Sequence, residues 1–243
     1  MSKPMTSTQY LAQMKKWGIT TRNYRDNWFE HNRTEATGKT FTDVKGVMLH
    51  HTGSDGHNPA LLWSGYSGLP GPLCHAGGAA DGVVWNIGWG YANHAGKGDD
   101  DVLAHVIAED YSGVLKPNEA NTDGNARFYG IEMEYSGSHG MGKPQYLSMI
   151  KWAAAICDFH EWGADSVIGH GEWQPGKWDP GYASGKMMDM NAVRNDIAAQ
   201  LKAGPGNPPT TPPKPPATPK VYDLKVGDTV RIGNSTLKVT EVK

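Results

Sequence analysis

The chain has 243 residues, of which 38% are hydrophobic, and carries a formal net charge of −2. This length allows one substantial domain with an appendage, and the apolar content is enough for a real core. The charge argues against a dedicated nucleic-acid-binding protein, and no apolar run reaches the roughly 18 residues of a membrane span. We therefore expect neither nucleic-acid binding nor membrane insertion. The two cysteines, Cys74 and Cys157, indicate reduced buried residues and no disulfide framework.

The first half of the chain predicts alternating helices and short strands. Thr6 and Gln9 have capping-box spacing before a helix that ends at Gly18. Apolar residues at 44–51 predict a buried strand with His50 and His51 at its carboxyl end. The elements expected after it are a short helix at 58–64, two strands at 73–78 and 83–87 around an Asp81-Gly82 turn, and a helix at 101–111.

The second half predicts a strand and two helices. Residues 128–135 alternate as a strand, which places Glu132 and Glu134 on one face and apolar side chains on the other. Two such carboxylates usually face solvent, but if their face lines a cleft, one of them can act as a general base. Residues 143–162 predict the strongest helix, with Gly163 as its C-cap, and a last helix follows from 190 to Gly204.

The end of the chain predicts a linker and a small appendage. Eight of the 16 prolines lie at 205–219, which indicates a semi-rigid linker between a domain at 1–204 and a β module at 220–243. That module is too small for an independent core, so it docks, oligomerises or forms a minimal unit. Residues 208–243 carry six Lys/Arg and three acids, a charge of +3 that suits an anionic wall or is ordinary solubilising charge.

A loop at 166–182 concentrates residues that can bind a metal. His170 and Asp179 lie nine residues apart in a segment rich in Trp and Gly, with Lys177 just before the carboxylate. Alone, this pattern fits a metal site and a surface loop with a solvated His and a turn-forming Asp equally well. A strand that ends in His50 and His51, of which one can face the loop, favours a metal site, because zinc accepts two imidazoles and a carboxylate and keeps a position for water. His94, in a Gly-rich loop, is expected to be exposed.

Four stretches resemble the zinc-dependent type 2 N-acetylmuramoyl-L-alanine amidases, the class shared by phage endolysins and peptidoglycan recognition proteins. They are VMLHHTG at 47–53, NHAG at 93–96, YGIEMEYSG at 129–137 and IGHGEWQPGKWDPGY at 168–182. The resemblance covers about residues 44–203. It implies an α/β fold with a mixed central sheet flanked by helices and a zinc site in a cleft at the sheet edge.

The resemblance also implies roles for individual residues. The zinc ligands would be His50, His170 and Asp179, the catalytic carboxylate Glu132, and the residue that stabilises the oxyanion Lys177. The residues expected to contact substrate are His94, Tyr91 and Trp173. His51 and Glu134 are left as supporting candidates, since adjacent strand residues point to opposite faces.

The implied function is hydrolysis of the amide between N-acetylmuramic acid and L-alanine in bacterial peptidoglycan. Two alternatives stay open, a module that binds muropeptide without cutting it and a zinc peptidase that acts on the stem peptide. The start of the chain has no hydrophobic signal core. This favours a phage lysin made in the host bacterial cytoplasm, which would need a hole-forming partner (a holin) to reach the wall. The oligomeric state is left open.

Overall fold

The structure, a computed structural model, describes residues 2–110, 113–206, 229–232 and 235–238. By its internal contacts the chain divides into two units, Met1–Pro213 and Lys214–Lys243. Among the described residues, none of the helices has both the length and the apolar character needed to cross a membrane.

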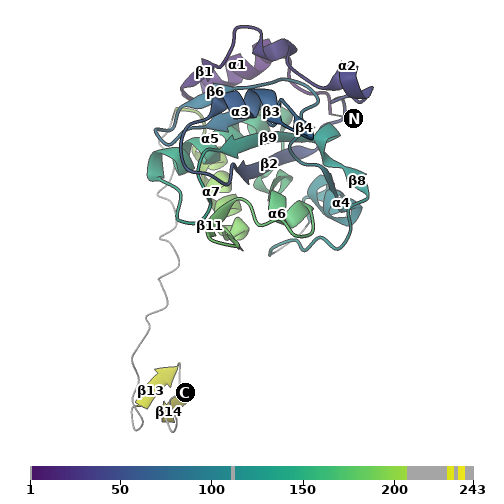
Figure 1. The fold of residues 1–243 in the computed structure, drawn as a ribbon. Helices are drawn as coiled ribbons and strands as arrows, with labels where there is room; N and C mark the ends of the chain where they lie inside the picture. The colour runs from purple at the N-terminus through teal and green to yellow at the C-terminus, as the bar shows by residue number, and fades with distance from the viewer. Residues whose placement is uncertain (1, 111–112, 207–228, 233–234, 239–243) are drawn as a thin grey trace. The chain divides into compact units, whose positions relative to one another are not determined.

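A six-stranded mixed sheet forms the centre of the first unit (Figure 1), with the strand order β1-β6-β5-β9-β2-β10. β10, β2, β9 and β5 run parallel to one another, whereas β6 is antiparallel to β5. The carboxyl ends of the four parallel strands therefore meet at one edge. The strands are β1 (Thr21–Asn23), β2 (Gly46–His51), β5 (Ala76–Gly78), β6 (Val84–Asn86), β9 (Phe128–Met133) and β10 (Val167–Gly169).

Helices flank this sheet, as the sequence predicted. They are α1 (Ser7–Lys16), α2 (Thr34–Thr37), α3 (Pro59–Ser64), α4 (Asp100–Ala108), α5 (Lys143–His160), α6 (His170–Trp173) and α7 (Met190–Ala203). Short 3-10 turns are η1 (Trp28–Glu30), η2 (Gly124–Ala126) and η3 (Ala164–Ser166). Three small antiparallel pairs are β3 (Gly65–Tyr66) with β4 (Leu69–Pro70), β7 (Lys97–Gly98) with β8 (Thr122–Asp123), and β11 (Gly181–Ala183) with β12 (Lys186–Met187).

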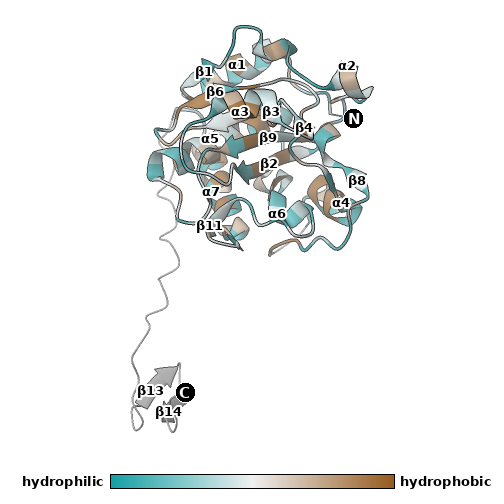
Figure 2. Ribbon diagram, in the orientation of Figure 1, coloured by the Kyte–Doolittle hydropathy of each residue, from teal (hydrophilic) through white to brown (hydrophobic). Residues whose placement is uncertain are grey.

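The two faces of the sheet carry separate apolar clusters, because side chains alternate along each strand. Val47 and Leu49 of β2 belong to the main cluster, which includes the buried side of α5. Met48 faces the other way, into a smaller cluster with Val102 and Val106 of α4. Figure 2 shows β2 and β9 as apolar strands whose carboxyl ends become hydrophilic. The sheet thus presents polar side chains at one edge of a buried core.

Most of the predicted helix ends are confirmed. The capping box of Thr6 and Gln9 begins α1, and Gly204, with φ 77°, ends α7. The prediction of Gly163 as the C-cap of α5 is wrong. Glu161 takes the left-handed position there, with φ 59°, and Gly163 is instead the N-cap of η3. Both cysteines are buried and free, as expected.

The second unit contains one described hairpin. β13 (Thr229–Ile232) pairs antiparallel with β14 (Ser235–Lys238), and Ile232 lies opposite Ser235. This antiparallel pair lies within the β module predicted at 220–243. The predicted linker at 205–219 lies almost entirely outside the described residues, as does most of the predicted module at 220–243.

A buried ion pair ties the loop after β10 to the last helix. Arg194 of α7 donates to both carboxylate oxygens of Glu172, at 2.8 and 3.1 Å. Glu172 has no exposed surface and also accepts from the backbone amides of Gly169 and Leu115. Because this carboxylate is fully paired, the pair fixes α6 against α7 at a tolerable desolvation cost.

Replacing Arg194 with Met should therefore leave a buried carboxylate without its counter-ion. We expect the free energy of unfolding to fall by roughly 3–5 kcal/mol, measured by urea denaturation. The matched control is Lys16→Met, which removes a half-exposed pair with Asp158 and should cost less than about 1 kcal/mol. Equal losses for the two variants would contradict the structural role given to the buried pair.

Candidate active site

The carboxyl edge of the sheet brings three polar segments together. His50 is the penultimate residue of β2, and Glu132 is its direct partner on the neighbouring strand β9. β10 ends at Gly169, so His170 follows it at the start of α6 on the other side of β2. Parallel pairing in this register places all three side chains at one edge. The loop after α6 then returns Asp179 to the same point, where its backbone carbonyl accepts from Gly171.

Three donor atoms converge there. His50 Nδ1 lies 3.0 Å from His170 Nδ1 and 3.1 Å from Asp179 Oδ2, and His170 Nδ1 lies 3.0 Å from the same oxygen. The two imidazoles are almost completely buried, at 1% and 5% exposed. The predicted ligand set is thus brought together in one compact group. We call these three atoms, which could donate lone pairs to a metal, the donor triangle.

Hydrogen bonds on the far side of each ring decide where the imidazole protons lie. His94 Nε2 donates to the carbonyl of Phe128, at 3.0 Å, so its Nδ1 is an acceptor. His50 Nε2 must then donate to that atom, at 3.1 Å, which leaves His50 Nδ1 without a proton. In the same way, His170 Nε2 donates to Gln174 Oε1, at 3.1 Å, and frees its own Nδ1.

The charge states of these groups suit a metal. Burial lowers the pKa of His50 to about 4, so the ring is neutral at neutral pH. Burial raises the pKa of Asp179, but a proton on either adjacent imidazole nitrogen would lower it more, and the net direction is well below the usual range, so the carboxylate is ionised. Neutral imidazoles and an ionised carboxylate are the forms that metal binding requires.

This arrangement fits a divalent cation. Three unprotonated atoms face one another at about hydrogen-bond distance, and their lone pairs repel unless a positive charge lies between them. Two imidazole nitrogens and one carboxylate oxygen form a donor set that zinc accepts in catalytic sites. The donor chemistry therefore matches the cofactor expected from the sequence.

Glu132 borders the triangle and has spare hydrogen-bonding capacity. Its Oε1 lies 4.0 Å from His50 Nδ1, and its Oε2 is buried with no hydrogen-bond partner among the described residues. Burial raises the pKa of Glu132 well above its usual range, and the charge of Asp179 adds to this, while Lys177 opposes it. Lys177 itself is exposed. Glu132 is thus a carboxylate poised to take up a proton.

Glu134 has a different position from Glu132. Its carboxylate contacts His57 Nδ1 and accepts from the backbone amide of Asn58, the N-cap of α3. It is 3% exposed, so it lies in the protein interior and not on the wet face of an edge strand. Its hydrogen bonds hold the segment before α3, whereas Glu132 borders the donor triangle.

His51 supports the loop that carries Asp179. Its Nδ1 accepts from the backbone amide of Gly181, at 2.8 Å, and the Tyr135 hydroxyl donates to the carbonyl of the same glycine. The His51 ring also contacts Trp178, with ring centroids 4.5 Å apart. His51 thus points away from the triangle, as strand alternation predicted, and fixes the chain two residues beyond Asp179.

The predicted substrate contacts occupy positions that the sequence did not reveal. Trp173 has no exposed surface and packs with Phe128 in the smaller apolar cluster, a position that does not favour the predicted substrate contact. Tyr91 is 2% exposed, and its hydroxyl donates to Asp123. His94 was expected to be exposed but is only 8% exposed, and both of its ring nitrogens are bonded.

Two further residues that shape the site were missed. Gln174 accepts the proton of His170 Nε2 and lies four residues after it, a helical spacing that could have revealed the pair. Asn125 Oδ1 accepts from three successive backbone amides, those of His94, Ala95 and Gly96. Nothing in the sequence links Asn125 to a loop some 30 residues earlier.

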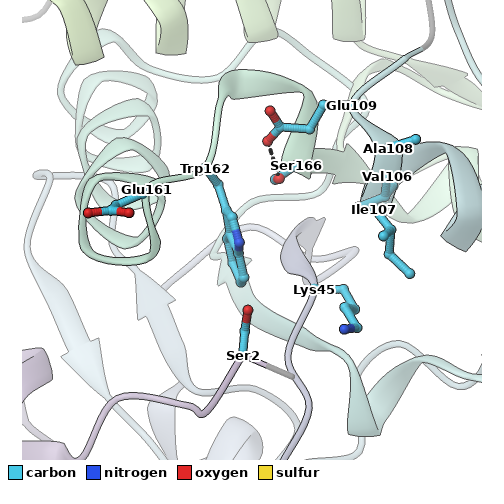
Figure 3. Close-up of a pocket in the computed structure, with 9 residues that line it drawn as sticks. All are labelled: Ser2, Lys45, Val106, Ile107, Ala108, Glu109, Glu161, Trp162 and Ser166. Carbon is cyan, nitrogen blue, oxygen red and sulfur yellow. Dashed lines mark hydrogen bonds between the residues drawn. The ribbon is translucent and has the colours of Figure 1, made fainter.

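A separate pocket of about 280 Å³ lies at the opposite end of the strands (Figure 3). Lys45 and Ser166, which line it, immediately precede β2 and β10, whereas the donor triangle follows them. The Glu109 carboxylate in this pocket is engaged by the Ser166 hydroxyl and the amide of Gly163. This pocket is therefore distinct from the candidate active site.

Comparison with known proteins identifies the class of this fold and site. A family model described as N-acetylmuramoyl-L-alanine amidase matches residues 40–182. The match spans more than half of the chain and includes every residue of the donor triangle. The chain belongs to the N-acetylmuramoyl-L-alanine amidase family. No curated protein matches it.

Solved structures resemble the chain at low sequence identity. A selenomethionine derivative of AmpD matches with a TM-score of 0.50 and 17% identity, over 73% of this chain and 96% of that one. An amidase, LysC, from Clostridium intestinale URNW matches with a TM-score of 0.47 and 16% identity, over 75% and 97%. The endolysin LysCS from the same organism gives 0.45 and 14%, over 68% and 88%. At this identity, the AmpD likeness shows a shared fold.

The buried histidines predict how stability depends on pH in the metal-free protein. Burial lowers the pKa of both His50 and His75 to about 4, below the ordinary histidine value of 6.5. The unfolded chain therefore binds more protons between these values, and stability should fall as the pH drops through this window, by at most about 3 kcal/mol per residue.

Urea denaturation of chelator-treated protein between pH 7 and pH 4 would measure this fall. A His75→Asn variant should show a shallower dependence, because one of the titrating groups is gone. A stability that is constant over the window would contradict the burial argument.

Proposed function

We propose that the protein is a zinc-dependent amidase that hydrolyses the bond between the lactyl group of N-acetylmuramic acid and L-alanine. The observation that carries the proposal is the triangle of His50 Nδ1, His170 Nδ1 and Asp179 Oδ2, three unprotonated donors within 3.1 Å of one another. Membership of the amidase family supplies the class of bond. The catalytic domain would be residues 1–204.

In this proposal His50, His170 and Asp179 hold the zinc ion. When bound, zinc supplies a Lewis acid that makes water a stronger nucleophile near neutral pH and polarises the scissile carbonyl. The protein's task is to hold the ligands in the right protonation states. The hydrogen bonds from His50 to His94 and from His170 to Gln174 do so, because they keep the imidazole protons away from the metal side.

Glu132 would carry the proton transfers. Amide hydrolysis needs one proton removed from the attacking water and one delivered to the leaving nitrogen of alanine, and a single carboxylate can do both in turn. The unpartnered Oε2 and the raised pKa of Glu132 suit this role. Lys177, exposed on the loop and close enough to lower the pKa of Glu132, would stabilise the developing oxyanion.

Two other functions compete with this proposal. A module that binds muropeptide without cutting it has no need of a complete metal site, and this chain retains all three predicted ligands. A zinc peptidase would use the same ligand set on the stem peptide. Digestion of purified peptidoglycan separates the three, because only the amidase releases intact stem peptides from the glycan, as mass spectrometry would show.

The biological setting that we propose is that of a phage endolysin, released to the bacterial wall with the help of a holin. A Pro-rich linker and the segment after it, which together carry a charge of +3 over residues 208–243, support a catalytic domain tethered to a wall-binding element. The linker and most of that segment lie outside the described residues, so this setting rests on the sequence.

One zinc ion per chain is the first expected result. His170→Ala should reduce the zinc content of purified protein to near zero, because it removes one donor of the triangle and leaves too few ligands. Metal analysis of dialysed protein measures it. His51→Ala is the matched control and should retain zinc, since His51 contacts the loop backbone and not the triangle. If His170→Ala retained zinc at the wild-type level, the assignment of His50, His170 and Asp179 as the zinc ligands would be wrong.

Glu132→Gln should separate chemistry from metal binding. It keeps the shape of the side chain but removes its basicity, so kcat should fall roughly 10²–10⁴-fold while zinc content and folding remain. Release of soluble peptides from peptidoglycan gives the rate. Glu134→Gln is the control, and should lose much less, because Glu134 holds the segment before α3. If Glu132→Gln kept a kcat within a few-fold of the wild type, Glu132 would not be the general base and another group would have to carry the proton.

A further inference from the structure

We propose that His94 is a positioning residue for the ligand His50. It determines the tautomer of His50 through a hydrogen bond on the side of the ring that faces away from the triangle. This inference rests on the proposed zinc function and extends it to a residue outside the proposed ligand set. His94 lies in the loop that precedes β7, and its ring packs edge to face against that of His50, with ring centroids 5.2 Å apart.

The direction of the hydrogen bonds follows from one backbone carbonyl. The Phe128 oxygen can only accept, so His94 Nε2, at 3.0 Å, carries a proton. In a neutral ring Nδ1 is then an acceptor, and His50 Nε2, at 3.1 Å, is the donor that reaches it. The proton of His50 is thereby fixed on the nitrogen that faces away from the triangle. Without this acceptor, His50 could place its proton on Nδ1, where it would compete with the metal.

The structure holds the His94 ring in place from two sides. Asn125 Oδ1 accepts from the amide of His94 and from those of the next two residues, which fixes the backbone of the loop. The ring fills the space above Gly130 of β9, where a Cβ atom would overlap it. These hydrogen bonds and this close packing restrict the His94 ring to one orientation, which indicates that the orientation matters to the site.

His75 provides a matched comparison within the same region. It is another fully buried imidazole with both nitrogens bonded, since its Nε2 donates to the carbonyl of Gly90 and its Nδ1 accepts from the amide of Gly130. Its hydrogen-bond partners in the described part of the chain are backbone atoms only. Its ring packs against that of His94, with ring centroids 5.5 Å apart, but it makes no hydrogen bond to His50. Loss of His75 should therefore disturb the core to a similar degree without altering the ligand.

The test compares three variants by zinc affinity. His94→Leu removes the acceptor, and its dissociation constant for zinc, from chelator competition, should rise about 10–100-fold. His94→Asn places a carboxamide oxygen near the position of Nδ1 and should bind zinc within about three-fold of the wild type, as should His75→Leu. An affinity of His94→Leu equal to the wild type would overturn the proposal, as would an equal loss in His75→Leu.

A second measurement needs no variant to fold and no metal to bind. Heteronuclear NMR of the metal-free wild-type protein at neutral pH reports which His50 nitrogen carries the proton. We expect Nε2 protonated and Nδ1 bare, and a proton on Nδ1 would overturn the proposal. If the wild type bound no zinc, the proposed function would fail, while the tautomer of His50 would still decide the role of His94.

Discussion

The site depends on keeping three electron-rich atoms together inside the protein. His50 Nδ1, His170 Nδ1 and Asp179 Oδ2 lie within 3.1 Å of one another, an arrangement that repels itself without a cation. The fold stabilises this arrangement by hydrogen bonds to the side of each group that faces away from the triangle. These bonds come from His94, Gln174 and the amide of Gly171, which lie outside the triangle. They hold the three groups close together against their mutual repulsion.

Sheet register is what makes this geometry possible. Parallel pairing aligns His50 with Glu132 on one side, and the end of β10 delivers His170 on the other. Four parallel strands that end at one edge bring residues more than 100 positions apart into contact. The same register determines which acid borders the donor triangle, since Glu134, two residues after Glu132, lies past the end of β9 and is bonded to the segment before α3.

Local patterns predicted the main helices and the central strands, but not β1 or α2, which lie in a polar segment without clear periodicity. The choice of His50, His170 and Asp179 as ligands came from the resemblance to the amidase family, because the loop pattern alone fits a metal site and an ordinary surface loop equally well. The roles of His94, Tyr91 and Trp173 could not be predicted in this way. A His in a Gly-rich loop has the same sequence signature whether it faces solvent or the back of a ligand. Its burial comes from Asn125 and Gly130, whose contacts with the loop exist only after the sheet has formed.

The ion pair of Glu172 and Arg194 has a consequence for how the protein is made. His170 lies in the segment that this pair ties to α7, and Asp179 follows it along the loop. During synthesis, that segment stays without its counter-ion until residue 194 has left the ribosome. We therefore expect the nascent chain to complete its hydrolytic centre late, after the strands that support it have already been made.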